Sequence, residues 1–347
     1  MNLNERCAAL GKLGKWLIDN EESLGGLFQK AFSENGWFDA DQCRCAIKQA
    51  ATEFFDEEKL FSWAAQYIDE NAFSKNIGII MAGNIPAVGL HDFISVFISG
   101  HKALVKFSDK DKVIIRFLLD KLEALSPGAA AYFEIIDRLQ SADAVIATGS
   151  DNSSRYFEYY FSKMPSIIRG NRNSIAILDG KENAADLALL AEDIFRYYGL
   201  GCRSVSKIYL PRDFNLEFFM QEMDAFSYQL LLNSKYKNNF DYNRSVFLLN
   251  QTPHLCNDAL ILAEDSSLQS RIATLHYEFY DSLETLEENL YEFRSKIQCI
   301  VSKIGLKTFE TLPFGQSQQP TLEDYADGID TMKFLKNLNL TENQVKL

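Results

Sequence analysis

The pattern of apolar and polar positions is most regular between residues 76 and 109. Ile77–Met81 is an apolar run of the length expected for a buried strand, and turn-forming residues follow it. Apolar residues then recur at helical spacing over Leu90–Ile98, Gly100 stands where a helix-terminating glycine belongs, and Ala103–Phe107 has the pattern of a second strand. This order predicts a βαβ unit with two parallel strands and a right-handed crossover.

The ends of these two strands are where a ligand is first expected. Gly83 and Asn84 follow the first strand, and Lys106, Ser108 and Asp109 follow or close the second. Open parallel sheets bind their ligands at the carboxyl ends of the strands. We therefore expect a cofactor at this edge of the sheet.

The rest of the chain divides into a helical beginning and an alternating remainder. Residues up to about 72 predict helices, one of them preceded by Asp39 and Gln42 in the spacing of a capping box. Further strands are expected at 144–147, 174–178, 205–210, 274–279 and 299–301, and further helices at 110–125, 156–161, 183–198, 214–232 and 329–338. The alternation predicts an α/β fold built on parallel sheets.

Composition narrows the function classes. The chain has 347 residues, of which 47% are hydrophobic, so it can form two domains, or one domain with a substantial appendage, around a large core. Its net charge of −13 disfavours a nucleic-acid surface as the main function. No apolar run approaches the roughly 18 residues that a membrane span needs, and no apolar signal core stands at the N-terminus, so we expect a cytoplasmic protein.

Cysteine and histidine usage gives no metal signal. The six cysteines are too scattered for a disulfide framework, and the four histidines lack ligand-type spacing. Cys43 and Cys45 are separated by one residue, which is not a spacing typical of zinc ligands. We expect no metal site.

Cys202 is the sharpest candidate for chemistry. Gly199 and Gly201 allow the backbone to approach a ligand closely, and the neighbouring Arg203 would favour a thiolate. A reactive thiolate in such a turn is typical of a nucleophilic cysteine. The alternative is a buried structural cysteine.

Three further stretches have a functional interpretation and a plain one. Thr148–Ser150 lies between a strand and a helix, so its amides and hydroxyls could hold a phosphate or simply cap the helix. Lys106 and Asp109 could reach a ribose or phosphate, or form a solvated charge pair. Asn84, by itself, is a turn residue.

The order of these stretches is more specific than any one of them. Asn84-Ile85-Pro86, Lys106-Phe107-Ser108-Asp109, Thr148-Gly149-Ser150 and Gly199-Leu200-Gly201-Cys202 follow one another along the chain. This succession resembles the Asn-Phe-Pro, Lys-Pro-Ser-Glu, Thr-Gly-Ser and Gly-Gln-x-Cys motifs of the aldehyde dehydrogenase superfamily. Within it, the chain is similar to acyl-CoA reductases related to the reductase subunit of the bacterial bioluminescence fatty-acid reductase. That closer resemblance is carried by 83–90, 168–174 and 324–334.

The resemblance implies a role for each matching position. Cys202 would be the nucleophile, and Asn84 would donate its side-chain amide to the oxyanion together with the backbone N–H of Cys202. The residues after the second strand would face the adenosine ribose, and those after the third the pyrophosphate. The residues expected to bind the cofactor are Gly83, Lys106, Ser108, Asp109, Thr148, Gly149 and Ser150.

The chain departs from the superfamily pattern at several positions. Leu200 replaces the usual Gln before the cysteine, and Phe107 replaces the Pro after the lysine. The Glu-Leu-Gly-Gly segment becomes Ile168-Arg169-Gly170-Asn171, so Ile168 occupies the position of the general-base glutamate. The equivalent of the glutamate that binds ribose in the catalytic half is unassigned.

The resemblance also implies the architecture. We expect an aldehyde-dehydrogenase-like α/β fold with two Rossmann-like lobes that contain parallel sheets. The expected parts are an N-terminal helical segment over 1–75, a nicotinamide-cofactor-binding lobe over 76–198, a catalytic lobe over 199–312, and a C-terminal loop and helix over 313–347 that return to the cleft.

The expected reaction is reduction of a fatty-acyl thioester to an aldehyde through an acyl-enzyme on Cys202. The family usually takes NADPH, but Asp109 near the ribose would repel a 2′-phosphate, so NADPH and NADH both stay open. The expected partner is acyl-CoA or another acyl-thioester donor. An acyl-transferring partner protein and a homo-oligomer stay open, and neither nucleic acid nor a membrane span is expected. The alternatives are a non-catalytic α/β subunit that binds acyl groups or a protein, and an ordinary aldehyde dehydrogenase, which Ile168 disfavours.

Overall fold

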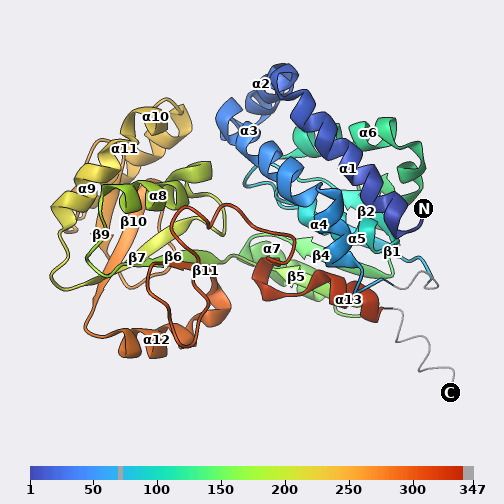
Figure 1. The fold of residues 1–347 in the computed structure, drawn as a ribbon. Helices are drawn as coiled ribbons and strands as arrows, with labels where there is room; N and C mark the ends of the chain where they lie inside the picture. The colour runs from blue at the N-terminus through green and yellow to red at the C-terminus, as the bar shows by residue number, and fades with distance from the viewer. Residues whose placement is uncertain (69–72, 339–347) are drawn as a thin grey trace. The chain divides into compact units, whose positions relative to one another are not determined.

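The computed structural model describes residues 1–68 and 73–338, and these form two compact units. Unit 1 contains residues 1–171 and the segment that starts at Thr321, whereas unit 2 contains residues 172–320. Each unit contains one β-sheet with helices around it (Figure 1). The expected α/β fold with two Rossmann-like parallel sheets and a helical N-terminal segment is confirmed.

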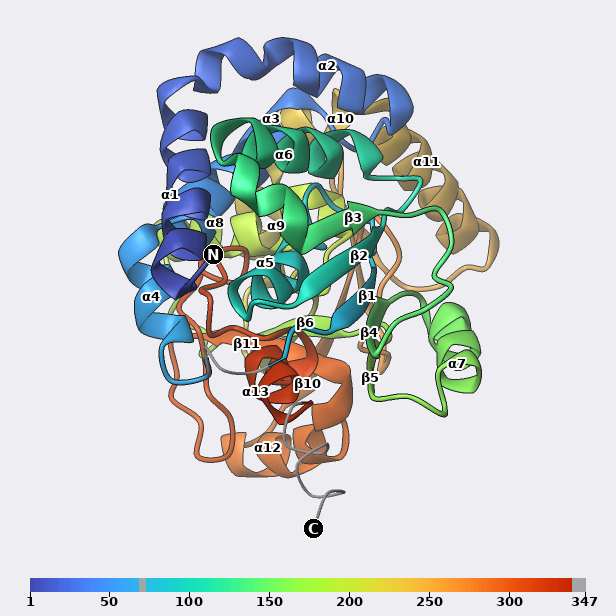
Figure 2. The ribbon, with the colours of Figure 1, turned by 90° about the vertical axis from the view of Figure 1, so that its right-hand side faces the viewer.

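The sheet of unit 1 has the strand order β3-β2-β1-β4-β5, and all its strand pairs are parallel (Figure 2). Because the chain passes from β1 to one side and later returns to pair β4 on the other side, the order reverses between β1 and β4. This is the strand arrangement of a dinucleotide-binding sheet, with its crevice at that reversal. The strands are β1 (Asn76–Ile80), β2 (Lys102–Lys106), β3 (Phe133–Ile135), β4 (Ala144–Thr148) and β5 (Ser166–Arg169).

The βαβ unit expected at 76–109 is present. β1 pairs in parallel with β2 through Ile77 opposite Ala103, and helix α5 (Leu90–Ile98) connects the two strands. Gly100 has φ +82°, a left-handed conformation that glycine adopts at least cost just after a helix. Local sequence signals therefore fixed both the crossover and its end.

The N-terminal helices share one core with this sheet. Buried apolar residues of α1 and α5, such as Leu10 and Phe93, belong to the same cluster as Ile77 in β1. Asn2 and Asp39 cap the first and third helices with their side chains. The helices of unit 1 are α1 (Leu3–Asp19), α2 (Gly25–Glu34), α3 (Ala40–Gln49), α4 (Glu57–Ala64), α5, α6 (Lys112–Leu125), α7 (Asp151–Tyr160) and α13 (Thr331–Asn337).

The sheet of unit 2 has the order β11-β6-β7-β10-β9-β8, and only the short edge strand β8 is antiparallel to its neighbour. Its central strands β6 and β7 are mostly buried, as expected when helices cover both faces. The strands are β6 (Asn173–Ile177), β7 (Val205–Pro211), β8 (Leu255–Cys256), β9 (Ile261–Glu264), β10 (Thr274–Tyr280) and β11 (Ile297–Ser302).

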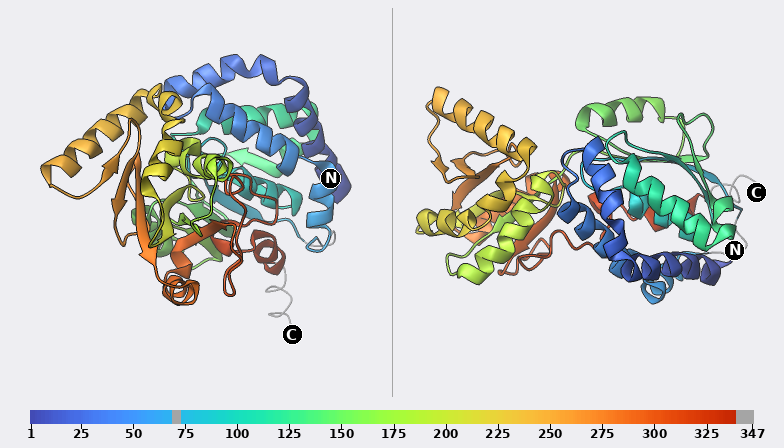
Figure 3. Two further views of the ribbon diagram at one scale, coloured as in Figure 1. Left: turned by 60° about the vertical axis from the view of Figure 1, so that its left-hand side comes forward. Right: turned by 90° about the horizontal axis from the view of Figure 1, so that it is seen from above.

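The helices of unit 2 differ from the sequence expectation in one place. The single helix expected at 214–232 is two helices, α9 (Leu216–Asp224) and α10 (Ser227–Leu231), and α11 (Ser234–Leu249) then follows (Figure 3). The Ser227 hydroxyl donates to the Asp224 carboxylate at the first break, and the Asn233 side chain caps α11. Polar side chains that bond locally compete with helix continuation, which explains the interruptions. The other helices are α8 (Ala184–Phe195) and α12 (Leu283–Glu292).

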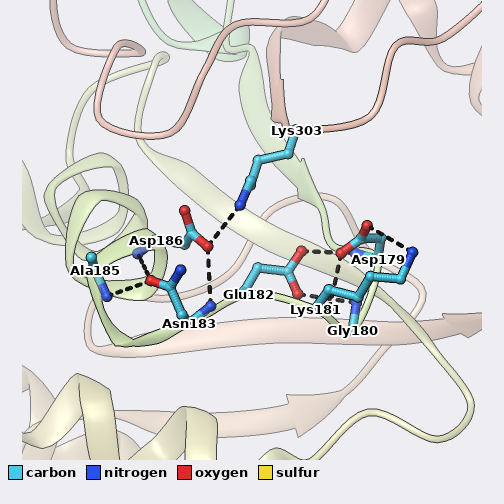
Figure 4. A network of polar contacts seen from close by, with 8 residues as sticks. All are labelled: Asp179, Gly180, Lys181, Glu182, Asn183, Ala185, Asp186 and Lys303. Atoms are coloured by element: carbon cyan, nitrogen blue, oxygen red, sulfur yellow. Dashed lines mark hydrogen bonds and ion pairs between the residues drawn. The ribbon is translucent and has the colours of Figure 1, made fainter.

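The turn that leads into α8 is held by its own polar side chains (Figure 4). Glu182 accepts hydrogen bonds from the backbone N–H groups of Asp179 and Gly180, at 2.8 and 3.0 Å. Asn183 and Asp186 form a capping box, and Lys303 donates to Asp186 at 2.8 Å. This network fixes where α8 begins.

The boundaries of the two units differ from the lobes expected in the sequence. The division falls between Asn171 and Arg172, not near residue 198, because β6 pairs with β7 and β11 in the second sheet and α8 follows it there. The expected C-terminal part also divides, since residues 313–320 belong to unit 2 and α13 to unit 1. Parts of the expected segments, 69–72 and 339–347, lie outside the described residues. Among the described residues, no helix is both long and apolar enough to cross a membrane.

Candidate cofactor cradle and candidate nucleophile

In unit 1, three of the expected stretches meet at one edge of the sheet. Adjacent strands β2, β1 and β4 end at Lys106, Ile80 and Thr148. The residues that follow these ends include Gly83, Asn84, Ser108, Asp109, Gly149 and Ser150. The described residues contain no ion pair between Lys106 and Asp109. The expected cofactor residues thus share the carboxyl edge on which such sheets bind dinucleotides.

Gly83 packs directly against the loop that follows β2. A methyl group on Gly83 would come within 2.5 Å of the Ser108 Oγ atom and within 2.7 Å of its Cβ atom. Any larger side chain would therefore push the two loops apart. Glycine is needed at position 83 because the two loops approach each other closely. The loop that Gly83 contacts is the one that carries the expected ribose-binding residues.

A buried carboxylate, Asp111, fixes the loop that carries Asn84. Its Oδ2 atom accepts a hydrogen bond of 2.6 Å from the backbone N–H of Ala87, a non-glycine residue with φ +59°. Burial raises the pKa of Asp111 well above its ordinary value, and the Ala87 N–H acts in the opposite direction. The sequence analysis missed Asp111, although an Asp that closes a strand-end loop could have been noted.

The Thr148–Ser150 stretch forms the expected junction between a strand and a helix. Ser150 is the N-cap of α7, and its Oγ atom accepts from the Ser153 N–H at 3.4 Å. A methyl group on Gly149 would lie 2.7 Å from the Ser153 Cβ atom, so the turn is too tight for a side chain. The helix-cap alternative is thus observed, and a capped N-terminus still presents amides that favour an anion.

Ile168 lies in β5, opposite Ala147 of β4. The next residue, Arg169, is buried and donates from Nη1 to both carboxylate oxygens of Asp92 at 2.7 Å, and from Nη2 to the Thr331 hydroxyl at 2.9 Å. Arg169 therefore joins three elements of unit 1, namely β5, α5 and α13. The segment that resembles Glu-Leu-Gly-Gly supplies an arginine anchor and no carboxylate.

In unit 2, Cys202 lies in a tight turn just before β7. The Ser204 N–H donates to the Gly201 carbonyl at 3.1 Å, and the Ser204 hydroxyl accepts from the Gly201 N–H at 3.3 Å. The Cys202 carbonyl accepts from the Ser174 Oγ atom at 3.0 Å. Gly199 has φ +72°, so the chain enters the turn through a left-handed residue. Cys202 itself is partly exposed, as a reactive thiol must be.

The thiol of a second cysteine, Cys299, contacts the same serine, Ser174. Its Sγ atom is 3.0 Å from the Ser174 Oγ atom, at the point where the register between β11 and β6 shifts. Burial raises the pKa of Cys299 to about 11, while Arg203 acts to lower it. The sequence analysis did not single out Cys299 or Ser174, because their link to Cys202 depends on strand pairing and not on spacing.

Comparison with known proteins first identifies the fold. Aldehyde dehydrogenase 21 from Physcomitrella patens, solved with its reaction product succinate, aligns with 98% of this chain and 85% of its own at a TM-score of 0.71 and 12% identity. An aldehyde dehydrogenase from Mycobacterium tuberculosis complexed with NAD⁺ covers 87% of this chain and 73% of its own, with a TM-score of 0.62 and 13% identity. At such identities the likeness establishes the fold of this superfamily.

An acetylating aldehyde dehydrogenase from Geobacillus thermoglucosidasius covers 96% of this chain and 90% of its own at a TM-score of 0.59 and 13% identity. Residues 67–225 match the family model described as acyl-CoA reductase (LuxC), while no curated protein matches. The chain thus has the fold of the aldehyde dehydrogenases. Over the matched residues it is similar to the LuxC acyl-CoA reductases, the family that the succession of motifs resembles.

Proposed function

We propose that this protein reduces a fatty-acyl thioester, such as acyl-CoA, to an aldehyde through an acyl-enzyme on Cys202. The observation that carries the proposal is the extent of the family match. Residues 67–225 match the acyl-CoA reductase family model, and every candidate residue from Gly83 to Cys202 falls inside that range. The tight, glycine-flanked turn around a partly exposed Cys202 supports the role of nucleophile.

In the proposed reaction the Cys202 thiolate attacks the thioester carbonyl, and the thiol of the donor leaves as the acyl-cysteine forms. Asn84 is proposed as a side-chain donor to the oxyanion. Addition of hydride to the acyl-cysteine gives a thiohemiacetal, which collapses to the aldehyde and frees the thiolate. A bound reduced nicotinamide would supply the hydride, which is the one chemical step the side chains cannot perform.

The nicotinamide dinucleotide is proposed to lie at the carboxyl edge of the sheet in unit 1. Gly83 packs closely against Ser108 and Gly149 against Ser153, so the loops at this edge are tight glycine turns. Such turns after the strands of an open parallel sheet are typical of dinucleotide sites. Ser108 and Asp109 are proposed to face the ribose, and Gly149 and Ser150 the pyrophosphate. Asp109 favours NADH because its charge would repel a 2′-phosphate, whereas the reductases that the chain resembles usually take NADPH. The activity assay therefore includes both cofactors.

The proposal includes the expected setting of the protein. We propose a cytoplasmic location. Six free thiols, all of them among the described residues, support it, because a reducing compartment keeps cysteines unpaired. An acyl-transferring partner protein and self-association remain proposals that follow from the resemblance alone.

The first prediction tests the nucleophile. Cys202→Ala is expected to abolish acyl-CoA reduction and to leave nicotinamide binding nearly unchanged, because the thiol supplies the covalent step and not the cofactor contacts. Oxidation of NADPH and NADH is followed by absorbance with acyl-CoAs of several chain lengths. Cys256→Ala is the matched control, since it removes an exposed thiol in β8.

A cofactor affinity that falls as steeply as activity in Cys202→Ala would identify a structural cysteine instead. Full activity in Cys202→Ala would exclude the acyl-cysteine mechanism and leave the non-catalytic subunit or a different mechanism. Activity on aldehyde and oxidised cofactor without CoA would favour an ordinary aldehyde dehydrogenase.

A further inference from the structure

A carboxylate in unit 2, Asp193, is fully buried although it takes no part in the turn that carries Cys202. It lies in the last part of α8 and has 0% exposure. Its Oδ2 atom accepts from the Gly315 N–H at 2.6 Å, and its Oδ1 atom accepts from the Ser317 N–H at 2.9 Å and the Ser317 hydroxyl at 2.7 Å. The donors of these three hydrogen bonds all belong to the short segment 315–317.

These three bonds fix residues 315–317 to α8. A buried carboxylate is stable only when donors replace its water, and hydrogen bonds to a charged acceptor are about twice as strong as neutral ones. Gly315 has φ +81°, and a methyl group there would lie 3.1 Å from the Leu189 side chain. Residues other than glycine at position 315 would therefore be strained in the backbone conformation that the segment adopts beside Asp193.

The same segment contacts the two residues that follow Cys202. The Gln318 side-chain amide donates to the Ser204 Oγ atom at 3.2 Å, and the Arg203 guanidinium donates to the Ser317 carbonyl at 3.5 Å. Ser204 Oγ is also the atom that accepts from the Gly201 N–H and closes the turn. Hydrogen bonds, together with the peptide bond between Ser317 and Gln318, thus connect Asp193 to both sides of Cys202.

Electrostatics supports the proximity of these groups. Burial raises the pKa of Cys299 to about 11, Arg203 acts to lower it, and Cys202 and Asp193 act to raise it further. Asp193 and Arg203 are therefore close enough to Cys299, the neighbour of the Cys202 turn, for their charges to act on its thiol. At Cys299 the charge of Arg203 favours the thiolate, whereas the charge of Asp193 opposes it.

We propose that Asp193 is a positioning residue for the nucleophile: through Ser317 and Gln318 it fixes Arg203 and Ser204, and thereby the thiol of Cys202. This inference rests on the proposed role of Cys202. The carboxylate never touches the substrate. Its role is to hold segment 315–318, so that the turn around Cys202 and the Arg203 side chain keep one geometry.

Asp193→Asn is the direct test, because it keeps the volume but replaces one acceptor oxygen by an amide donor facing other donors. Asp186→Asn is the matched control at the opposite end of α8, where Asp186 bonds to Lys303. The full chain is treated with limiting iodoacetamide at one pH, and alkylation of Cys202 is measured by peptide mass spectrometry. The exposed Cys256 in the same molecule is the internal reference.

In Asp193→Asn we expect the alkylation rate of Cys202 relative to Cys256 to fall about tenfold or more, as misplacement of a reacting group can cost up to about a hundredfold. Asp186→Asn leaves the ratio unchanged. An unchanged or increased ratio in Asp193→Asn overturns the proposal. A variant that loses only fold stability would change both thiols together.

Gln318→Ala keeps the proposal testable if Asp193→Asn does not fold, since it breaks the contact with Ser204 without disturbing a buried charge. The neighbouring Gln319→Ala is its control, because Gln319 bonds only within the segment, to the Gly315 carbonyl. Gln318→Ala should lower the alkylation ratio and kcat with little change in cofactor KM, and equal behaviour of the two variants overturns the proposal. Alkylation needs no acyl-CoA, so it can fail while Cys202→Ala still abolishes activity, which separates this inference from the proposed function.

Discussion

In the proposed function, Ile168 stands where hydrolytic aldehyde dehydrogenases carry a general-base glutamate, and an apolar side chain cannot take a proton from water. Water that attacked an acyl-cysteine would release fatty acid and waste the activated acyl group before reduction. General-base assistance is typically worth about 10²–10⁴-fold in rate. Its absence at this position should therefore let reduction and thiol exchange outrun hydrolysis.

We predict that acyl-CoA added without nicotinamide gives a long-lived acyl adduct on Cys202, with fatty acid released slowly. Intact-mass spectrometry over time measures the adduct, and Cys202→Ala is the control that should carry none. If fatty acid appears as fast as aldehyde does in the complete reaction, another residue acts as base and the interpretation of Ile168 is wrong.

At the residue scale, the sequence suggested the groups that lie in recognisable motifs and missed those that act through long-range contacts. Cys202, Asn84 and Ser150 stand in short patterns of glycine, proline and polar residues, so their environment can be read locally. Asp193 meets Ser317, a partner more than 120 residues away, and Cys299 meets Ser174 only through strand pairing. No local signal distinguishes such an Asp from a surface one.

At the scale of elements, a single arginine joins β5, α5 and α13. Arg169 is buried with Asp92 and Thr331, and its guanidinium bridges both of them. Removal of one partner of a buried ion pair leaves the other charge desolvated, at a cost of about 3–5 kcal/mol. Replacement of both partners by apolar residues is often nearly neutral.

Arg169→Met is therefore expected to lower the free energy of unfolding of unit 1 by about 3–5 kcal/mol, because Asp92 stays buried without its cation. The double variant Arg169→Met with Asp92→Leu should recover much of that loss. Urea unfolding followed by tryptophan fluorescence reports this unit alone, since Trp16, Trp37 and Trp63 all lie in it. A single variant as stable as the parent protein would show that the pair contributes little.

Periodicity predicted most elements because each has its own local signal, such as the apolar stripe of α5 and the apolar run of β1. Periodicity did not predict the elements whose existence or bounds depend on tertiary contacts. The short strand β3 (Phe133–Ile135) has too few residues to show a pattern, and the interrupted α9 and α10 look continuous in hydrophobicity. The division into units was misplaced because β6 follows β5 closely in sequence yet pairs in the other sheet.

At the scale of the whole molecule, unit 1 is discontinuous in sequence. Trp63 donates its indole N–H to the Tyr325 hydroxyl at 2.8 Å, Tyr67 donates to Asp330 at 2.9 Å, and His91 contacts the Leu322 carbonyl at 2.9 Å. The segment after Pro320 thus completes the core around α4 and α5, whereas unit 2 is a single stretch of chain.

Truncation after Pro320 is predicted to destabilise unit 1 selectively. Loss of α13 leaves Arg169 without Thr331 and exposes apolar residues of α5. The strand pairs of the second sheet, in contrast, all lie within residues 172–320. Hydrogen–deuterium exchange should show faster exchange in α5 and β5 and unchanged protection in β7 and β10. Uniform loss of protection in both sheets would mean that the two units unfold as one.

The same discontinuity sets an order of events during translation. Ribosomes add about 5–20 residues per second, and domains generally fold as units once their chain is available. Residues 172–320 leave the ribosome as a complete unit before Thr321, whereas the first 171 residues must wait for the last helix to seal their core. The portion proposed to bind the nicotinamide begins first and finishes last. In a cell, the thiol-bearing unit therefore has all of its sequence available before the cofactor-binding unit does.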